Sequence, residues 1–153
     1  MGKRHYLVQF LLMAISQQKL REVVFHLLYS YDFAQNAASE MIPFLMGYHA
    51  IPKKALYIAE EKKQAILAKL PEIDALISET SLAYEFSRIS CIEKNILRLG
   101  VFELHFAEDI PHKVAIAEAI RLARKFSTPE GATFVNAILD VLYKKKLLQP
   151  AIC

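Results

Sequence analysis

The sequence predicts an all-α fold, a compact bundle of about seven helices, and three observations support this. Apolar residues recur with a period near 3.6 along most of the chain, while strand-like alternation is scarce. The chain has 153 residues, of which 54% are hydrophobic and only 4 are glycine, so it can bury a core and is not disordered throughout. Serine, threonine and proline stand where several apolar-periodic segments begin, as they do at helix starts.

The first three predicted helices occupy residues 19–33, 36–48 and 53–70. In the first, five residues are expected on the buried side: Leu20, Val24, Leu27, Leu28 and Tyr31. The second is short, ends at Gly47 and leads through a loop into Pro52. In the third, four charged residues are expected to form a solvated face: Glu60, Glu61, Lys62 and Lys63.

A proline in the first turn marks the start of the fourth predicted helix. Pro71 can occupy that turn, and the periodic pattern continues to about Phe86. Four residues of this segment are expected to point inward: Ile73, Leu76, Ile77 and Leu82.

The last three predicted helices each begin at a cap or a first-turn proline. Ser90 and Glu93 form a candidate capping box for a helix to about residue 108 that is apolar on nearly all sides, and is therefore expected to be central. Pro111 begins a helix that ends near residue 126. Thr128, followed by proline, begins the last helix, which runs to about residue 146.

Composition limits the class of protein. The formal net charge of +3 is mildly basic, which permits contact with nucleic acid without requiring it. Cys91 and Cys153 are too far apart to suggest a disulfide framework, so reduced thiols in a cytoplasmic protein are expected. The apolar run at residues 6–15 is too short to span a membrane. Residues 1–16 are interpreted as an N-terminal extension, with Met13 as a candidate start, before a single domain at residues 17–148.

The sequence carries no recognisable catalytic pattern. It has no glycine-rich phosphate loop, no G-x-S-x-G, no H-E-x-x-H and no C-x-x-C. The adjacent carboxylates of Glu60 and Glu61 would point about 100° apart on a helix, which is poor geometry for acid–base work. The sequence therefore predicts a protein that is not an enzyme and has no metal site.

Polar residues instead form narrow stripes along the predicted helices. The fifth helix has a basic line of Lys94, Arg98 and His105, at i, i+4 and i+11. The first and last helices have mixed stripes, made of Lys19, His26 and Ser30 with Tyr29 at the edge, and of Thr133, Asn136, Asp140 and Lys144 with Phe134 beside them. The sixth helix adds four cations: Lys113, Arg121, Arg124 and Lys125.

Such stripes have two interpretations. Cations can neutralise phosphates while Tyr29 or Phe134 stacks on an unpaired base, which is how proteins hold single-stranded nucleic acid. The alternative is structural, because helices ordinarily expose charges and aromatic rings often cover the edge of a core.

Four segments together resemble the NusB family of bacterial transcription antitermination factors. They are L-R-E-V-V-F-H-L-L-Y-S-Y-D, E-K-N-I-L-R-L-G-V-F-E-L, H-K-V-A-I-A-E-A-I-R-L-A-R-K-F and F-V-N-A-I-L-D, in this order, between about residues 19 and 144. The resemblance implies a helical protein of two small subdomains that binds boxA-type single-stranded RNA together with a ribosomal small-subunit protein, NusE. It further implies that this complex works with RNA polymerase and other Nus factors to support transcription of ribosomal RNA operons and rRNA maturation, without a cofactor.

The resemblance also implies site residues. The RNA-binding set consists of Lys19, Arg21, Tyr29, Arg98, Phe134 and Asn136, and the acidic residues Glu93 and Glu130 match positions near the ribosomal-protein interface. The family's arginine-rich N-terminal segment is reduced here to Gln-Gln-Lys-Leu-Arg at residues 17–21, and Thr133 replaces a frequent lysine. Ala137 stands where the family pattern favours glycine.

The sequence leaves three alternatives open. The reduced basic segment favours a protein-interaction adaptor with little RNA binding of its own. A second hypothesis is that the protein is a detached relative of the domain that precedes some rRNA cytosine methyltransferases. Members of the family occur as monomers and as homodimers, so a homodimer is an alternative to a monomer.

Overall fold

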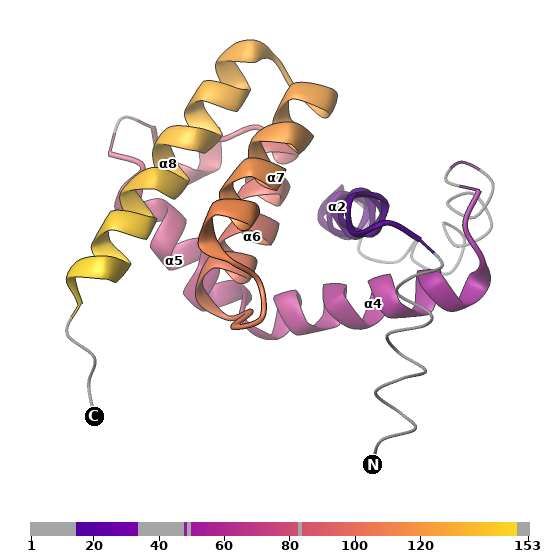
Figure 1. Cartoon of the computed structure of the whole chain (residues 1–153). Helices are drawn as coiled ribbons and strands as arrows, with labels where there is room; N and C mark the ends of the chain where they lie inside the picture. The colour runs from indigo at the N-terminus through magenta and orange to yellow at the C-terminus, as the bar shows by residue number, and fades with distance from the viewer. Residues whose placement is uncertain (1–14, 34–47, 49, 83, 150–153) are drawn as a thin grey trace. The chain divides into compact units, whose positions relative to one another are not determined.

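The computed structural model describes residues 15–33, 48, 50–82 and 84–149 (Figure 1). The chain divides into two compact units, Met1–Leu67 and Ala68–Cys153. The described residues contain six α-helices, one 3-10 helix and no strand, which confirms the predicted all-α class. The predicted helix at residues 36–48 lies outside the described residues except for Tyr48.

The first unit contains α2 (Gln17–Phe33) and α4 (Lys53–Ala68) up to the boundary at residue 67. Helix α2 begins two residues earlier than predicted, because the Ser16 hydroxyl accepts a hydrogen bond of 3.0 Å from the Lys19 backbone N–H. The predicted inward residues Leu20, Val24, Leu27 and Leu28 are buried, whereas Tyr31 is only half-buried.

One residue of the predicted solvated face in α4 is buried. The Lys63 side chain is only 3% exposed, and its ammonium forms an ion pair with Glu60 and lies 5.7 Å from the centre of the Tyr31 ring. The expectation for Lys63 was therefore wrong. A lysine has a long apolar stem, so it can lie against a helix interface when a carboxylate and an aromatic face receive its charge.

The second unit contains the other helices. They are α5 (Leu70–Thr80), η1 (Phe86–Arg88), α6 (Cys91–His105), α7 (His112–Phe126) and α8 (Pro129–Leu148). Helix α6 packs against α5, α7 and α8, and most of its residues from Asn95 to Leu104 are buried (Figure 1). The expectation that an almost wholly apolar helix would be central is confirmed.

The predicted helix starts of this unit are confirmed closely. The Ser90 side chain accepts a hydrogen bond from the Glu93 backbone N–H and caps α6, and Thr128 caps α8 through the Gly131 backbone N–H. Pro71 lies in the first turn of α5, and Pro111 is the residue before α7. Local cap chemistry therefore determines where these helices begin.

Helix α5 ends earlier than predicted, at Thr80 instead of Phe86. The Thr80 hydroxyl donates to the Leu76 carbonyl, and the Ser81 hydroxyl donates to the Tyr84 carbonyl, so both side chains bond to the backbone at the helix end. Beyond this end the helical phase no longer applies. Leu82, which was predicted to point inward, is 94% exposed.

None of the described helices is both long enough and apolar enough to span a lipid bilayer.

Candidate nucleic-acid and partner surfaces

A pocket between the start of α6 and the start of α8 contains three of the predicted site residues. Its volume is about 200 Å³, and it is lined by Tyr84, Arg88, Ile89, Ser90, Glu93, Thr128, Glu130, Gly131 and Phe134. The Tyr84 and Phe134 rings meet edge to face, with their centres 5.9 Å apart. The structure therefore brings Glu93 and Glu130, the predicted partner-binding residues, together with Phe134, a predicted RNA-binding residue.

Glu93 has structural contacts within this pocket. Its carboxylate accepts hydrogen bonds from the hydroxyls of Ser90 and Ser127, the latter at 3.4 Å. A Cβ added at Gly131 would lie 2.4 Å from the Glu93 Oε1, so the carboxylate occupies the space that this glycine leaves open. Glu93 therefore connects the start of α6 to the start of α8. Glu130, in contrast, is exposed.

A second groove lies between the end of α7 and the start of α8. It has a volume of about 520 Å³ and is lined by Ile120, Arg124, Pro129, Ala132, Thr133 and Asn136. Asn136 and Thr133 are exposed there, and the Thr133 hydroxyl donates to the Pro129 carbonyl at 3.1 Å. Because Phe134 and Asn136 are two positions apart on a helix, about 200°, they line different hollows.

Arg98 lies inside the second unit. It is 8% exposed, and its guanidinium binds both Asp74 carboxylate oxygens, at 2.9 and 3.0 Å, and also donates to the Asn95 side-chain oxygen at 3.2 Å. This two-pronged geometry is the preferred one for an arginine and a carboxylate. The contacts give Arg98 a role in joining α5 to α6, while its proposed role in RNA binding stays a prediction.

The other members of the predicted basic line on α6 are also in contact with neighbouring groups. The Lys94 ammonium lies 4.8 Å from the centre of the Phe86 ring, and the Arg98 guanidinium lies 5.8 Å from the same ring. The prediction placed these residues on one side of α6, but Phe86 of η1 and Asp74 of α5 cover that side at Arg98. Lys94, Arg98 and His105 therefore do not form one open ridge.

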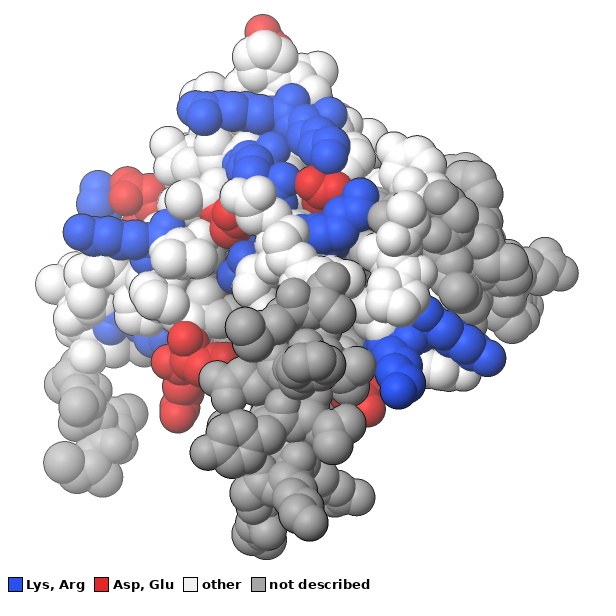
Figure 2. Space-filling model, turned by 45° about the vertical axis from the view of Figure 1, so that its right-hand side comes forward, with Lys and Arg blue, Asp and Glu red and all other residues white. Residues whose placement is uncertain are grey.

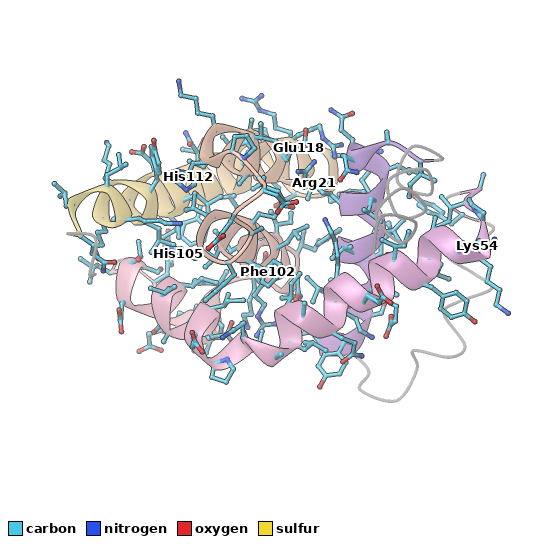
Figure 3. All side chains as sticks on the ribbon, turned by 60° about the horizontal axis from the view of Figure 1, so that its bottom comes forward. Arg21, Lys54, Phe102, His105, His112 and Glu118 are labelled. Atoms are coloured by element: carbon cyan, nitrogen blue, oxygen red, sulfur yellow. The ribbon has the colours of Figure 1, made fainter. Side chains whose placement is uncertain are left out.

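His105 lies at the C-terminal end of α6, where Figure 3 labels it beside Phe102. Its Nε2 atom is buried and has no hydrogen-bond partner among the described residues. Burial lowers the pKa of His105 below its ordinary value of 6.5, and the charges of Lys146 and His112 lower it further. The Lys146 ammonium donates to the Leu104 carbonyl at 2.7 Å and so satisfies one of the last carbonyls of α6.

The remaining predicted RNA-binding residues belong to α2 in the first unit. Lys19 is partly exposed, with its ammonium 4.0 Å from the Glu22 carboxylate, whereas Arg21 is only 7% exposed. Tyr29 is half-buried, and its ring centre lies 6.2 Å from that of Phe25. The predicted RNA-binding set is thus divided equally, with three residues in each unit.

The hollows are also lined by Tyr84, Arg88 and Arg124, whose side chains can bind a ligand and which were not selected as site residues from the sequence. Tyr84 lies beyond the end of α5 at Thr80, where the predicted helix to Phe86 does not form, and Arg88 is the last residue of η1. Arg124 was noted only as one of four cations on its helix. The described residues contain no cluster of three or more histidine, cysteine or acidic side chains that could hold a metal ion.

Comparison with known proteins identifies the family. Residues 18–144 match the NusB family. The chain is 37% identical over 127 residues to the transcription antitermination protein NusB of Chlamydia pneumoniae, which covers 83% of this chain and 79% of that protein.

Solved structures agree with this match. NusB of T. maritima superposes with a TM-score of 0.72 at 32% identity, covering 86% of this chain and 92% of that one. A chain from the crystal structure of the antitermination factors NusB and NusE with dsRNA gives the same TM-score at 25% identity, covering 84% and 96%. This chain therefore belongs to the NusB family.

Proposed function

We propose that this protein is a cytoplasmic transcription antitermination factor that binds boxA-type single-stranded RNA together with the ribosomal small-subunit protein NusE. In this role it supports processive transcription of rRNA operons and rRNA maturation, in a complex with RNA polymerase and other Nus factors. The observation that carries the proposal is the family match over residues 18–144, a span that includes every predicted RNA-binding and partner-binding residue.

The surfaces of the second unit support this proposal. The pocket at the start of α6 and α8 combines the carboxylates of Glu93 and Glu130 with an aromatic pair, which is chemistry suited to a basic protein partner. The groove between α7 and α8 combines a cation with an amide, which suits a nucleic-acid strand. A related NusB has been crystallised with NusE and dsRNA, so the family fold is compatible with both kinds of partner.

A test of this function is fluorescence anisotropy with a labelled boxA-like RNA, with and without NusE. We expect tighter binding to this RNA than to a scrambled RNA of the same composition, and further tightening when NusE is present. Equal binding of the two RNAs under both conditions would reject the proposal.

A second candidate is a protein-interaction adaptor with little intrinsic RNA binding. It is favoured by the pairing of Arg98 with Asp74 and by the glutamines at positions 17 and 18, which leave fewer cations for phosphates. An adaptor would bind NusE with an affinity that RNA does not change and that salt changes little. If adding RNA raises the affinity for NusE, the adaptor function is excluded.

A further inference from the structure

Among the arginines of the second unit, Arg88 and Arg124 have no side-chain partner among the described residues, and of these two only Arg124 lines the groove between α7 and α8. Arg124 is exposed on α7. Arg98 is held by Asp74, and Arg121 is held by Glu118 at 2.9 Å. Arg124 is therefore a cation whose hydrogen-bonding capacity is available to a ligand.

The groove around Arg124 presents further polar groups and no carboxylate among its lining residues. The Asn136 amide forms no hydrogen bond with another described residue, and the Thr133 hydroxyl oxygen can still accept one after donating to Pro129. Asp140, one turn beyond Asn136 on α8, is held by Lys144 at 2.9 Å. The local charge balance thus favours an anionic ligand.

The upper part of the molecule in Figure 2 carries several lysine and arginine side chains together with acidic ones, near the place where Figure 1 shows α7 passing into α8. Ile120, Pro129 and Ala132 provide an apolar floor for the groove itself. A cation and an amide above such a floor match a nucleotide, which has a charged phosphate, a polar base edge and a less polar sugar.

We propose that the groove between α7 and α8 holds one nucleotide of the bound RNA, with Arg124 on the phosphate and Asn136 on the base edge or ribose. This inference rests on the proposed function and assigns Arg124 to it. A guanidinium can bind two phosphate oxygens at once, and such charge-assisted bonds are the strong ones at a protein surface. An acidic protein segment is the competing ligand for Arg124. Its carboxylates only accept hydrogen bonds, so they would match the amide donor of Asn136 but not its carbonyl acceptor.

The test compares charge-matched variants of the full-length protein. Arg124→Gln removes the groove cation and Lys145→Gln removes another exposed cation without a described partner, so the two have the same net charge. Binding of the boxA-like RNA is measured by anisotropy at several salt concentrations from roughly 50 to 300 mM, because the salt slope is the change of log K with log salt concentration. We expect Arg124→Gln to weaken binding about tenfold. We also expect its salt slope to fall by roughly 0.7, the value of one lost phosphate contact to a single strand.

Two further variants separate the contribution of the Asn136 amide from that of the Arg124 guanidinium. Asn136→Ala should weaken binding of the boxA-like RNA while leaving the salt slope unchanged, because it removes no charge. Arg124→Lys should keep most of the salt slope but recover only part of the affinity. Equal thermal unfolding midpoints of the variants and the wild type would establish that the fold is intact, as expected for exposed residues without described partners.

The outcomes distinguish the groove from the wider function. If the wild type binds the RNA and Arg124→Gln behaves like Lys145→Gln, the groove proposal is overturned while the proposed function stands. If Arg124→Gln instead weakens binding of NusE without RNA, the groove is a protein surface and the proposal is also overturned. If the wild type binds no RNA with or without NusE, both proposals fall.

Discussion

The bidentate pair of Arg98 and Asp74 places a charge inside the second unit. The Arg98 side chain is only 9% exposed and that of Asp74 is 25% exposed, so water cannot fully replace either partner. The stability of the second unit therefore depends on both residues. A buried charge that loses its counter-ion keeps the cost of leaving water. The pair therefore connects α5 to α6 more firmly than an exposed ion pair would.

Asp74→Ala should consequently destabilise the protein by about 2 kcal/mol, less than for a fully buried pair because water can partly reach Arg98. Urea unfolding at neutral pH measures this change. Glu72→Gln is a matched control on the same helix, since its ion pair with Lys69 is exposed and should contribute less than about 1 kcal/mol. Similar unfolding midpoints for the two variants would contradict a structural role for the Arg98 pair.

His105 should make stability depend on pH in a defined direction. Burial, Lys146 and His112 lower its pKa in the folded protein below 6.5, so between that pKa and 6.5 the unfolded chain binds more protons. The free energy of unfolding should therefore fall as the pH decreases through this range. His105→Leu should reduce this dependence, as measured by urea unfolding at several pH values. An unchanged pH dependence in His105→Leu would show that another group is responsible.

At the scale of single residues, the sequence predicted which residue types matter better than what they touch. The positions of Glu93 and Phe134 in one pocket follow from two helix starts that meet in space, and this meeting cannot be read from spacing along the chain. Asp74 was not recognised as the partner of Arg98 for the same reason, because the two lie on different helices. Helical phase predicts the side of a helix, and only packing determines what covers that side.

At the scale of elements, helix α8 is continuous from Pro129 to Leu148 and exposes Ala137 in its interior. The helix was predicted closely because its start is determined locally by Thr128 and the following proline. The end of α5 was predicted poorly because threonine and serine side chains compete with the backbone there, and apolar periodicity does not register this competition.

Ala137→Gly provides a test of the intrinsic helix contribution. The side chain is exposed, so little packing is lost, and the substitution should cost about 1 kcal/mol through the greater conformational freedom of glycine. Thermal unfolding measures the change, with Ala137→Ser as a control that retains a Cβ and should cost less. A neutral glycine variant would indicate that the helix is strained at this point.

At the scale of the whole molecule, a net charge of +3 gives only modest attraction to RNA, so individual phosphate contacts should be measurable. The first turn of α2 begins with Gln17 and Gln18, both exposed. If the proposed function is correct, the double variant Gln17→Arg/Gln18→Arg should bind the boxA-like RNA more tightly and increase the salt slope by roughly 1.4.

The control for that experiment is Gln149→Arg, which adds a charge at the end of α8. It should change the salt slope by less than half as much as the double variant. An equal change in salt slope per added charge would mean that RNA binding depends on the net charge of the protein and not on the start of α2.

The hydrogen bond from Lys146 to the Leu104 carbonyl has a dynamic consequence. It ties the closing turn of α8 to the closing turn of α6, so fraying of one helix end removes a carbonyl partner from the other. Amide hydrogen exchange should therefore report a single opening event at both ends, with similar protection factors. Lys146→Met should accelerate exchange in the last turn of α6 while leaving the amides near Ser90 unaffected.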